Sequence, residues 1–443
     1  MRVELLYGRG KLAVDFPENL CITTIRKKPM PAAPDPAERL RESFRDPGLG
    51  LPLRDLARRR TKACILVCDI TRPVPHAALL PPLIEELAAG GMSKDQILVL
   101  VATGLHRPNE GAELREVIGS EAVFDRAQVA NHFARNREAH ADLGRTPSGI
   151  PILLDRRFVE ADLRIAVGLV EPHFMAGYSG GRKLVVPGVA HRDTIFKLHA
   201  GGIMDHERTA NAVIEGNPVH LEQLHMVRAV GEILALNVVI DEDRRIGFVN
   251  FGPIESSHLE AVAFARPYSE VPVARRFKTV VTTGAGYPLD KTYYQTVKGM
   301  VGVLDILEPG GTIVIASECS EGMGSPEFVE AQRALSRMGP ERFVADVVAR
   351  NHARIDEWQT QMLVKALRRG AVRLYTTGLQ PSDLADTFVD PAVSVEKAVL
   401  ASVNTHQDPC VAVVPEGPYV IPVYKIRNSK HETRNKFEGS KRQ

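Results

Sequence analysis

Cysteine, net charge and long apolar runs are all scarce in this sequence, and each scarcity excludes a class of protein. The 443 residues contain five cysteines and carry a formal net charge of +2 at pH 7. Five scattered cysteines argue against a disulfide framework and fit a reducing, cytoplasmic compartment. A charge so close to neutral gives no basis for a nucleic-acid interface or a membrane-surface patch. No apolar run reaches the length of a membrane span, so we expect no membrane partner.

The chain is too long for one ordinary hydrophobic core, so we expect two domains. Its hydrophobic content of 44% and charged content of 25% are typical of a globular protein. Apolar runs alternate with helical patterns, which predicts an α/β fold with two domains, each a mostly parallel sheet flanked by helices. Predicted strands cover 63–70, 96–104, 162–170, 232–241, 244–252, 277–286, 310–319 and 371–378, and predicted helices cover 76–91, 256–265, 293–307 and 325–338.

A break in this alternation sets the predicted domain boundary. Residues 266–277 read as a linker, after which the strand and helix patterns begin again. We therefore assign an N-terminal cofactor-binding domain to residues 1–269 and a C-terminal domain to residues 270–405. We expect the last strand, within 406–425, to return to the first domain. Residues 426–443 are basic and polar, and we expect a solvated tail there.

Polar side chains follow three of the predicted strands directly. Asp69 and Arg72 lie in DITRP, His106 lies in ATGLHRP, and His173 lies in GLVEPH. The carboxyl ends of parallel strands are where open α/β sheets bind ligands. A single histidine there would be ordinary, because a lone histidine is more often structural than catalytic. Two histidines and an Asp/Arg pair at three strand ends favour a shared cleft.

A glycine-rich loop, EPHFMAGYSGGRK, follows the third of these strands. Gly180 and Gly181 precede Arg182 and Lys183, which resembles a phosphate cradle. It is not a P-loop, because Leu184 stands where a magnesium-binding Ser or Thr is required. The loop could still offer N–H groups to an anion. A tight turn explains the glycines equally well, and a solvated charge pair explains the two basic residues.

The second half of the chain carries weaker signals. The segment TTGAGYP follows a predicted strand, but Leu289 stands where the third glycine of a dinucleotide site belongs. In the next predicted helix, Tyr294 and Lys298 are one turn apart, and Gln295 shares the face of Lys298. That face could line an anion-binding pocket, or it could be an ordinary solvent-exposed face of the helix. Trp358 is the single tryptophan, and most single tryptophans are packing anchors.

Five segments taken together resemble one known family. DITRP, TGLHRP, EPHFMAGYSGGRK, KLHAGG and YYQTVKG, in this order and spacing, are similar to the nickel-pincer nucleotide-dependent lactate racemases over about residues 60–415. One departure is Cys68, where many relatives carry an acidic residue. The resemblance implies an isomerase that interconverts D- and L-2-hydroxy acids, a cleft between two domains as active site, and cofactor-making enzymes as partners.

The resemblance also implies a cofactor and the residues that hold it. The cofactor is nickel pyridinium-3,5-bisthiocarboxylic acid mononucleotide, joined covalently to the lysine that matches Lys183. His199 matches the histidine that binds nickel, and imidazole suits square-planar nickel. Gly180 and Gly181 would lie against the cofactor, because glycine permits close backbone approach. Asp69 would bind the cofactor or orient Arg72.

The implied chemistry is reversible hydride transfer. Removing the Cα–H of a 2-hydroxy carboxylate as a proton would place two negative charges on adjacent groups. Removing it as a hydride instead gives a neutral ketone group. A hydride acceptor is then needed, and the cofactor supplies it. An acid/base is needed on each side, and His106 and His173 match the pair of the family. The substrate-binding residues implied by the resemblance are Arg72, Tyr294, Gln295, Lys298 and Trp358.

Other functions remain open on the sequence. The same chemistry could act on malate or a larger 2-hydroxy acid, and Arg107 is a candidate for a second substrate carboxylate, although a surface arginine would look the same. A catalytically silent cofactor-binding protein would not need two acid/base histidines. An NAD-dependent dehydrogenase built on TTGAGYP would lack a complete fingerprint.

Overall fold

The structure is a computed structural model that describes residues 1–425. Over that range the chain divides into two compact units. The N-terminal unit comprises residues 28–269 and 325–364, and the C-terminal unit comprises residues 1–27, residues 270–324 and the chain from Lys365 onward. Each unit is built around its own parallel-dominated sheet, which confirms the predicted fold class.

The N-terminal unit is organised by a sheet that, within the described residues, has six strands in the order β13-β12-β9-β4-β5-β6. Neighbouring strands are parallel except for the antiparallel pair β12–β13. The strands are β4 (Ala63–Cys68), β5 (Ile97–Ala102), β6 (Gln128–Asn131), β9 (Leu163–Leu169), β12 (Leu234–Ile240) and β13 (Ile246–Pro253). The central strands are continuous apolar runs because helices cover both faces of the sheet.

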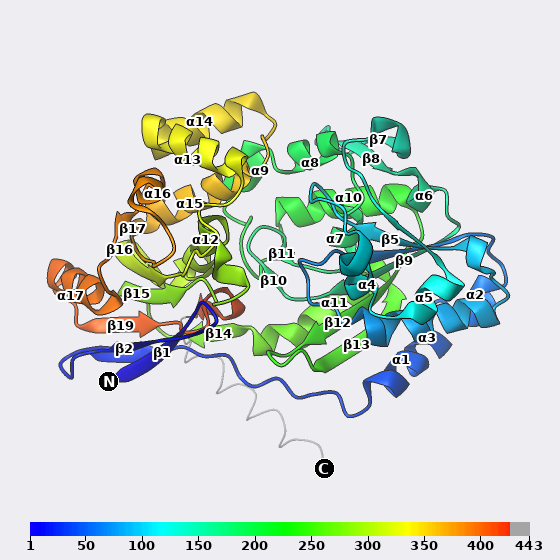
Figure 1. The fold of residues 1–443 in the computed structure, drawn as a ribbon, viewed down its shortest axis with the longest axis horizontal. Helices are drawn as coiled ribbons and strands as arrows, with labels where there is room; N and C mark the ends of the chain where they lie inside the picture. The colour runs from blue at the N-terminus through cyan, green and yellow to red at the C-terminus, as the bar shows by residue number, and fades with distance from the viewer. Residues whose placement is uncertain (426–443) are drawn as a thin grey trace, which may run out of the picture. The chain divides into compact units, whose positions relative to one another are not determined.

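Helices cover the two faces of this sheet (Figure 1). One face packs against the first helices of the unit, whose apolar side chains share a core with β4 and β5. These helices are α1 (Pro36–Arg45), α2 (Leu53–Ala57), α3 (His76–Ala89), α4 (Gly111–Ile118) and α5 (Glu121–Arg126). The other face carries α7 (Arg182–Val185), α10 (Pro218–Val230) and α11 (Ile254–Ala265). Smaller elements are β7 (His140–Arg145), β8 (Pro151–Asp155), α6 (Arg156–Val159), β10 (Pro172–His173), β11 (Gly177–Tyr178), α8 (Arg192–Leu198) and α9 (Gly201–Asp205).

A distant segment completes the N-terminal unit. It contains α13 (Pro326–Met338), α14 (Pro340–Arg350) and the first turns of α15 (Glu357–Arg369). The backbone N–H of Ala353 donates to the carbonyl of Phe196 at 3.0 Å, and the Gln361 side-chain amide donates to the carbonyl of Gly201 at 2.7 Å. These bonds attach the segment to α8 and α9.

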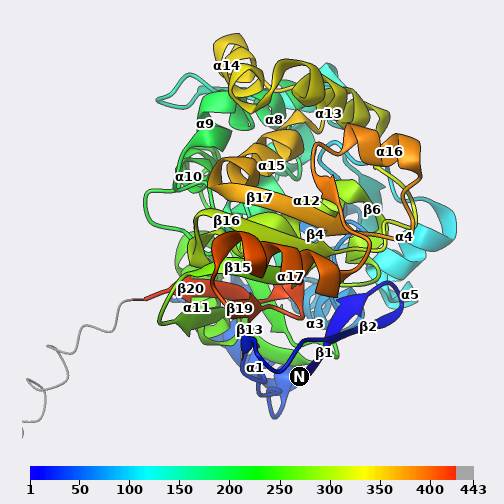
Figure 2. The ribbon, with the colours of Figure 1, turned by 90° about the vertical axis from the view of Figure 1, so that its left-hand side faces the viewer.

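The C-terminal unit contains a second sheet that, among the described residues, has six strands in the order β18-β17-β16-β15-β19-β3, all parallel. They are β3 (Cys21–Thr24), β15 (Phe277–Thr283), β16 (Leu307–Ala316), β17 (Gly370–Tyr375), β18 (Asp390–Pro391) and β19 (Cys410–Val413). One face packs against α17 (Val395–His406) and the hairpin of β1 (Arg2–Tyr7) and β2 (Gly10–Asp15) (Figure 2). Helix α12 (Tyr293–Gly302) follows β15, and α16 (Pro381–Asp386) precedes β18.

The compact units depart from the predicted domains at three places. Residues 1–27 belong to the C-terminal unit, because β3 pairs with β19. Residues 325–364 belong to the N-terminal unit. The strand predicted to return to the first domain is β19, and it pairs with β15 of the second sheet instead. Part of the predicted linker forms β14 (Glu270–Val273), which pairs with β20 (Ile421–Tyr424). The predicted tail, 426–443, lies outside the described residues.

Within residues 1–425, no helix combines the length and the apolar character that crossing a bilayer requires.

Candidate functional site

Three neighbouring strands of the N-terminal unit deliver the predicted polar residues to one edge of their sheet. Strand β4 pairs in parallel with β5 on one side and with β9 on the other. Asp69 follows β4 directly, His106 lies in the loop after β5, and Glu171 lies just beyond β9. Parallel strands end at the same edge, so these three loops lie at one edge of the sheet, and a shared site there remains a prediction.

His106 and Asp69 form a hydrogen-bonded pair at this edge. The ring Nδ1 lies 2.6 Å from Asp69 Oδ2, and Asp69 Oδ1 accepts from the Thr71 N–H at 3.2 Å and from the Thr71 hydroxyl at 2.5 Å. Burial raises the pKa of Asp69, but the hydrogen bonds from His106 and Thr71 outweigh burial and hold the pKa below its ordinary value. An ionised Asp69 only accepts, so His106 Nδ1 donates and Nε2 is the nitrogen that can take a proton.

His173 is held in the opposite way. Strand β10, which contains it, pairs with β11 so that His173 faces Gly177. Its Nδ1 accepts from the backbone N–H groups of Met175 and Ala176, both at 3.2 Å. Nδ1 therefore carries no proton, and in the neutral ring the proton is on Nε2. In their neutral forms, His106 therefore presents an accepting Nε2 and His173 a donating Nε2.

Arg72 forms an ion pair with Glu171. Burial lowers the pKa of Arg72, but the charge and hydrogen bond of Glu171, together with Cys68 and Asp69 nearby, outweigh burial and raise the pKa above its ordinary value. Asp69 was predicted to bind the cofactor or to orient Arg72, whereas the side chain that pairs with Arg72 is Glu171. No role was predicted for Glu171, which lies within GLVEPH. Its position, two residues before His173 at a strand end, was the signal that could have identified it.

Lys183, His199 and Trp358 form a second group in the same unit. His199 Nδ1 donates to the carbonyl of Ile195 at 2.8 Å. Burial lowers the pKa of His199 from 6.5 to about 4; the Ile195 bond opposes this shift, and the positive charge of Lys183 adds to it. The rings of His199 and Trp358 lie 4.6 Å apart between centroids. A neutral imidazole with Nδ1–H on a carbonyl presents Nε2 as a metal ligand.

The glycines of the loop have a packing role inside the N-terminal unit. Gly180 and Gly181 have φ angles of +75° and +47°. A Cβ at Gly180 would lie 2.7 Å from Val170 Cγ2, and a Cβ at Gly181 would lie 3.0 Å from the His258 ring. The tight-turn alternative is thus supported at both positions, and contact of these glycines with a cofactor remains a prediction. Arg182 is 2% exposed, so the alternative of a solvated charge pair is wrong for it.

Three predicted substrate residues lie on α12 of the C-terminal unit. Tyr294, Gln295 and Lys298 are partly buried on the side of the helix away from its core residues, which are Tyr293, Thr296, Val297 and Met300. The Oε1 atom of Gln295 is buried without a hydrogen-bond partner. A buried amide oxygen without a partner is costly unless a ligand satisfies it. This face therefore has spare hydrogen-bonding capacity at Gln295, and its role in substrate binding remains a prediction.

Two other sequence signals have local explanations. Arg107, the candidate for a second substrate carboxylate, is 71% exposed and makes two hydrogen bonds to Glu113, at 2.6 and 2.7 Å. In TTGAGYP, a Cβ at Gly284 would lie 2.6 Å from Ser317 Oγ and 2.8 Å from the Asp290 Cβ. That glycine is needed for packing in the C-terminal unit. In residues 1–425 no three His, Cys, Asp or Glu side chains gather in a group that could hold a metal ion.

Two family models cover most of the chain. The lactate racemase N-terminal domain matches residues 7–211, and the lactate racemase C-terminal domain matches residues 274–422. The lactate racemase of Thermoanaerobacterium thermosaccharolyticum is 31% identical over 424 residues, covering 95% of this chain and 98% of that protein. The lactate racemase of Lactiplantibacillus plantarum is 30% identical over 374 residues, covering 83% and 87%.

Solved structures agree with these matches. The lactate racemase apoprotein from Thermoanaerobacterium thermosaccharolyticum superimposes with a TM-score of 0.87 at 30% identity, over 95% of this chain and all of the other. A protein from Thermotoga maritima superimposes with a TM-score of 0.63 at 17% identity over 89% of this chain, which shows a shared fold alone.

Proposed function

The chain belongs to the lactate racemase family and is an isomerase, and we propose that it interconverts the D and L forms of a lactate-like 2-hydroxy acid. The observation that carries this proposal is that two histidines predicted as acid/bases are each fixed at Nδ1, by opposite kinds of partner. His106, held by Asp69, has a proton-accepting Nε2, and His173, held by two backbone N–H groups, has a protonated Nε2. A catalytically silent binding protein has no use for such a pair, and a dehydrogenase does not need two acid/bases.

The proton chemistry follows from these two states. His106 Nε2 takes the hydroxyl proton of one enantiomer as its hydride leaves, and later returns that proton to solvent. The proton that completes the other enantiomer comes from His173, whose ring must first take up a second proton from solvent. The reverse reaction runs the same transfers backwards. Asp69 stabilises the charged ring of His106 that forms in this step. Arg72, held by Glu171, binds the substrate carboxylate through its planar guanidinium. We assign Tyr294, Gln295 and Lys298 to the remaining contacts with the substrate, and Gln295 Oε1 has capacity for one more hydrogen bond.

The residues present fit the cofactor that the resemblance implies. Lys183 lies close enough to His199 to lower its pKa, which agrees with one residue carrying the nucleotide and the other its nickel. His199 is neutral at physiological pH and has Nδ1 fixed on Ile195, so Nε2 is available to nickel. When bound, the cofactor would accept the substrate hydride and return it. Trp358 limits the motion of the His199 ring, and Asp69 acts on His106. The proposal also includes a cytoplasmic location and cofactor-making enzymes as partners.

Substrates with a second carboxylate fit this site less well. The guanidinium of Arg107 already makes a two-point contact with Glu113. Recruiting Arg107 to malate would break that contact. We therefore place lactate and other monocarboxylic 2-hydroxy acids before malate.

The test is an enantiomer assay on protein made in cells that also make the cofactor, with nickel supplied. Pure L-lactate and pure D-lactate are each incubated with the protein, and both enantiomers are measured by chiral chromatography. We expect each to become the same mixture, without any NADH absorbance when NAD is added. Nickel-loaded protein that leaves both enantiomers and a panel of longer 2-hydroxy acids unchanged would refute the proposal.

The proposed role of His173 can be tested in the same assay. The two enantiomers have equal free energy, so the ratio of the two kcat/KM values is fixed by equilibrium. We expect His173→Asn to slow both directions equally, by about 10²- to 10⁴-fold. Near-normal rates in this variant would remove His173 from the proton chemistry.

A further inference from the structure

Each backbone carbonyl from residue 175 to residue 179 accepts a hydrogen bond from elsewhere in the N-terminal unit. This segment lies between His173 and Lys183, which the proposed function uses as an acid/base and as the attachment point of the cofactor. The donors, in the order of the carbonyls, are Asn217 Nδ2, Arg182 Nη2, the N–H of Ala212, Arg182 Nη2 again and His258 Nε2. A buried polar network that is satisfied at every carbonyl makes the loop rigid.

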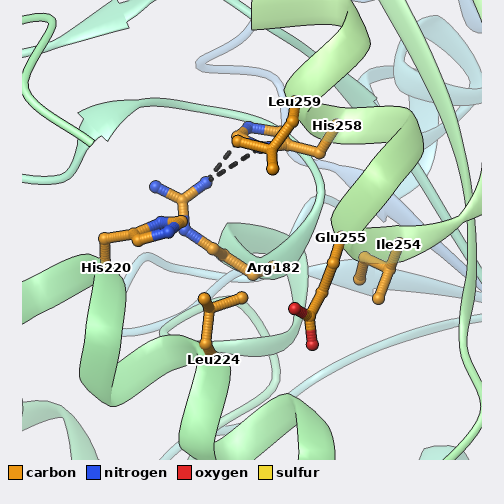
Figure 3. A pocket seen from close by; sticks show the side chains of 7 residues that line it. All are labelled: Arg182, His220, Leu224, Ile254, Glu255, His258 and Leu259. Atoms are coloured by element: carbon orange, nitrogen blue, oxygen red, sulfur yellow. Dashed lines mark hydrogen bonds between the residues drawn. The ribbon is translucent and has the colours of Figure 1, made fainter. Parts of the chain in front are cut away.

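Arg182 is the donor that holds two of these carbonyls at once. Its Nη2 donates to Ala176 at 2.8 Å and to Tyr178 at 3.2 Å. Its Nη1 lies 3.0 Å from His258 Nε2 and 3.5 Å from His258 Nδ1 (Figure 3). The His258 Nε2 donates to the Ser179 carbonyl at 2.8 Å. Burial, and then the charge of Arg182, lower the pKa of His258 to about 3, so a neutral ring supports the guanidinium.

Stability alone does not explain an arginine at this position. Arg182 is 2% exposed, and its Nε has no hydrogen-bond partner. Burial lowers its pKa to about 9, so the side chain is still charged at neutral pH. Among the described residues no Asp or Glu pairs with this guanidinium. Burying a charge without a counter-charge is costly, and an apolar side chain would fill the same space at a lower cost. What an apolar side chain lacks is the hold on two carbonyls.

The residue that connects this hold to the candidate site is Ala176. Arg182 fixes the Ala176 carbonyl, and the Ala176 N–H donates to His173 Nδ1 at 3.2 Å. The N–H of Met175 donates to the same nitrogen, also at 3.2 Å. These two bonds keep Nδ1 unprotonated, so the proton of the neutral ring is on Nε2. A turn that relaxed would withdraw both N–H groups and leave the ring free to exchange tautomers.

We propose that Arg182 is a positioning residue for His173. It holds the carbonyls of Ala176 and Tyr178, which keeps the turn after His173 closed and the two N–H groups on Nδ1. Arg182 therefore acts through the loop and needs no contact with the substrate or the cofactor. This inference rests on the proposed function, in which His173 is an acid/base, but the tautomer of His173 can be measured without any activity.

The direct test records the ring nitrogens of His173 by NMR. The full chain is labelled with ¹⁵N-histidine, purified without cofactor and measured at mildly alkaline pH, and the His173→Asn variant identifies the signals. We expect an unprotonated Nδ1 in the wild type. In Arg182→Lys we expect both ring signals to move toward the average of the two tautomers, because an ammonium lacks the planar fork. Arg164→Lys is the matched control, because Arg164 donates to the carbonyls of Phe158 and Val159 in the same unit.

Kinetics then test what the tautomer does. With nickel measured per chain, kcat of the loaded Arg182→Lys variant should fall about 10- to 100-fold, as it does when a reacting group is misplaced. KM should stay unchanged, because Arg72 binds the substrate carboxylate in the proposed function. Arg164→Lys should keep both values. If the wild type racemises no 2-hydroxy acid, the proposed function fails, and the NMR result still decides whether Arg182 sets the tautomer.

Two results would overturn the positioning role. One is a protonated Nδ1 at His173 in the wild type, and the other is an Arg182→Lys variant with unchanged His173 signals. If Arg182→Lys does not fold, the same measurement is made on His258→Gln, which removes the ring that supports the guanidinium. We expect the His173 signals to move in the same direction there, and unchanged signals would contradict the proposal.

Discussion

His106 and His199 lie in the same unit and both donate Nδ1–H, yet their surroundings prepare them for different chemistry. The partner of His106 is the carboxylate of Asp69, and its side chain is 63% exposed. The partner of His199 is the neutral carbonyl of Ile195, and burial with the nearby charge of Lys183 lowers its pKa to about 4. A carboxylate stabilises a protonated ring, whereas a carbonyl in a buried setting keeps the ring neutral. In the function proposed above, the partner at Nδ1 is what distinguishes the acid/base from the metal ligand.

The largest expected effect separates these two roles. His106→Asn should retain nickel and lose about 10²- to 10⁴-fold in kcat, because it removes only the proton acceptor. His199→Asn should lose most of the bound nickel, and activity with it, because it removes the metal ligand. Nickel is measured by elemental mass spectrometry on purified protein, beside the enantiomer assay. Loss of nickel from His106→Asn, or its retention in His199→Asn, would reverse the assignment.

A smaller effect is expected from the partner of His106. Asp69→Asn keeps the shape of the residue but replaces the accepting oxygens with an amide that can donate. The charged ring then loses its stabilisation and its fixed tautomer, and we expect kcat to fall by about 100-fold while KM changes little. Steady-state kinetics with both enantiomers provide the measurement. A rise in KM alone would show that Asp69 contacts the substrate instead.

A smaller effect again is expected from changing Arg72, which we propose binds the substrate carboxylate. Arg72→Lys keeps the charge but removes the planar fork, so we expect KM to rise about 10- to 100-fold, the worth of a hydrogen bond between charged groups. Arg107→Lys at an exposed arginine nearby in sequence is the matched control, and its KM should stay the same. If both variants raise KM alike, Arg107 also binds the substrate. Malate would then be as good a candidate substrate as lactate.

The buried histidines predict the smallest effect, a dependence of stability on pH. Burial lowers the pKa of His76 from 6.5 to about 4, against the opposing bond to the Val117 carbonyl. The unfolded chain then takes up the proton more readily, so this contribution is complete above pH 6.5 and is lost as the pH falls toward 4. For a histidine with this shift, the free energy of unfolding falls by about 2 kcal/mol when the pH is lowered from 7 to 5.

Urea unfolding of the cofactor-free protein at several pH values measures this dependence. His76→Leu should have a shallower decline below pH 6.5 than the wild type, and His352→Asn, at an exposed position, serves as the control. An unchanged slope in His76→Leu would show that His76 does not contribute to the decline.

Much of the fold could be predicted from the sequence, because the central strands are continuous apolar runs. Strands β4, β5 and β9 matched their predicted segments closely, and so did β12 and β13. The membership of residues 325–364 could not be predicted. It depends on contacts such as the bond from Gln361 to Gly201, which are 160 residues apart. No local pattern contains that information.

In the candidate site, too, local patterns could be predicted from the sequence and long-range contacts could not. The sequence identified His106 and His173 as a pair through strand ends and a family resemblance. It could not show that Nδ1 donates in one ring and accepts in the other, because this difference depends on Asp69, 37 residues from His106, and on the turn after His173. Glu171 and the buried state of Arg182 were missed for the same reason. A carboxylate before a proline and an arginine beside a lysine look like ordinary surface residues until their partners are known.

The account depends most on the cofactor at Lys183, so the most direct test is a peptide mass map across that residue. The protein should come from its own host, or from cells that also make the cofactor, with nickel supplied. We predict a nucleotide-sized adduct on Lys183 and nickel in the intact protein. An unmodified Lys183 in protein from a host shown to make the cofactor would contradict the account, and His199 and the two acid/base histidines would then need another explanation.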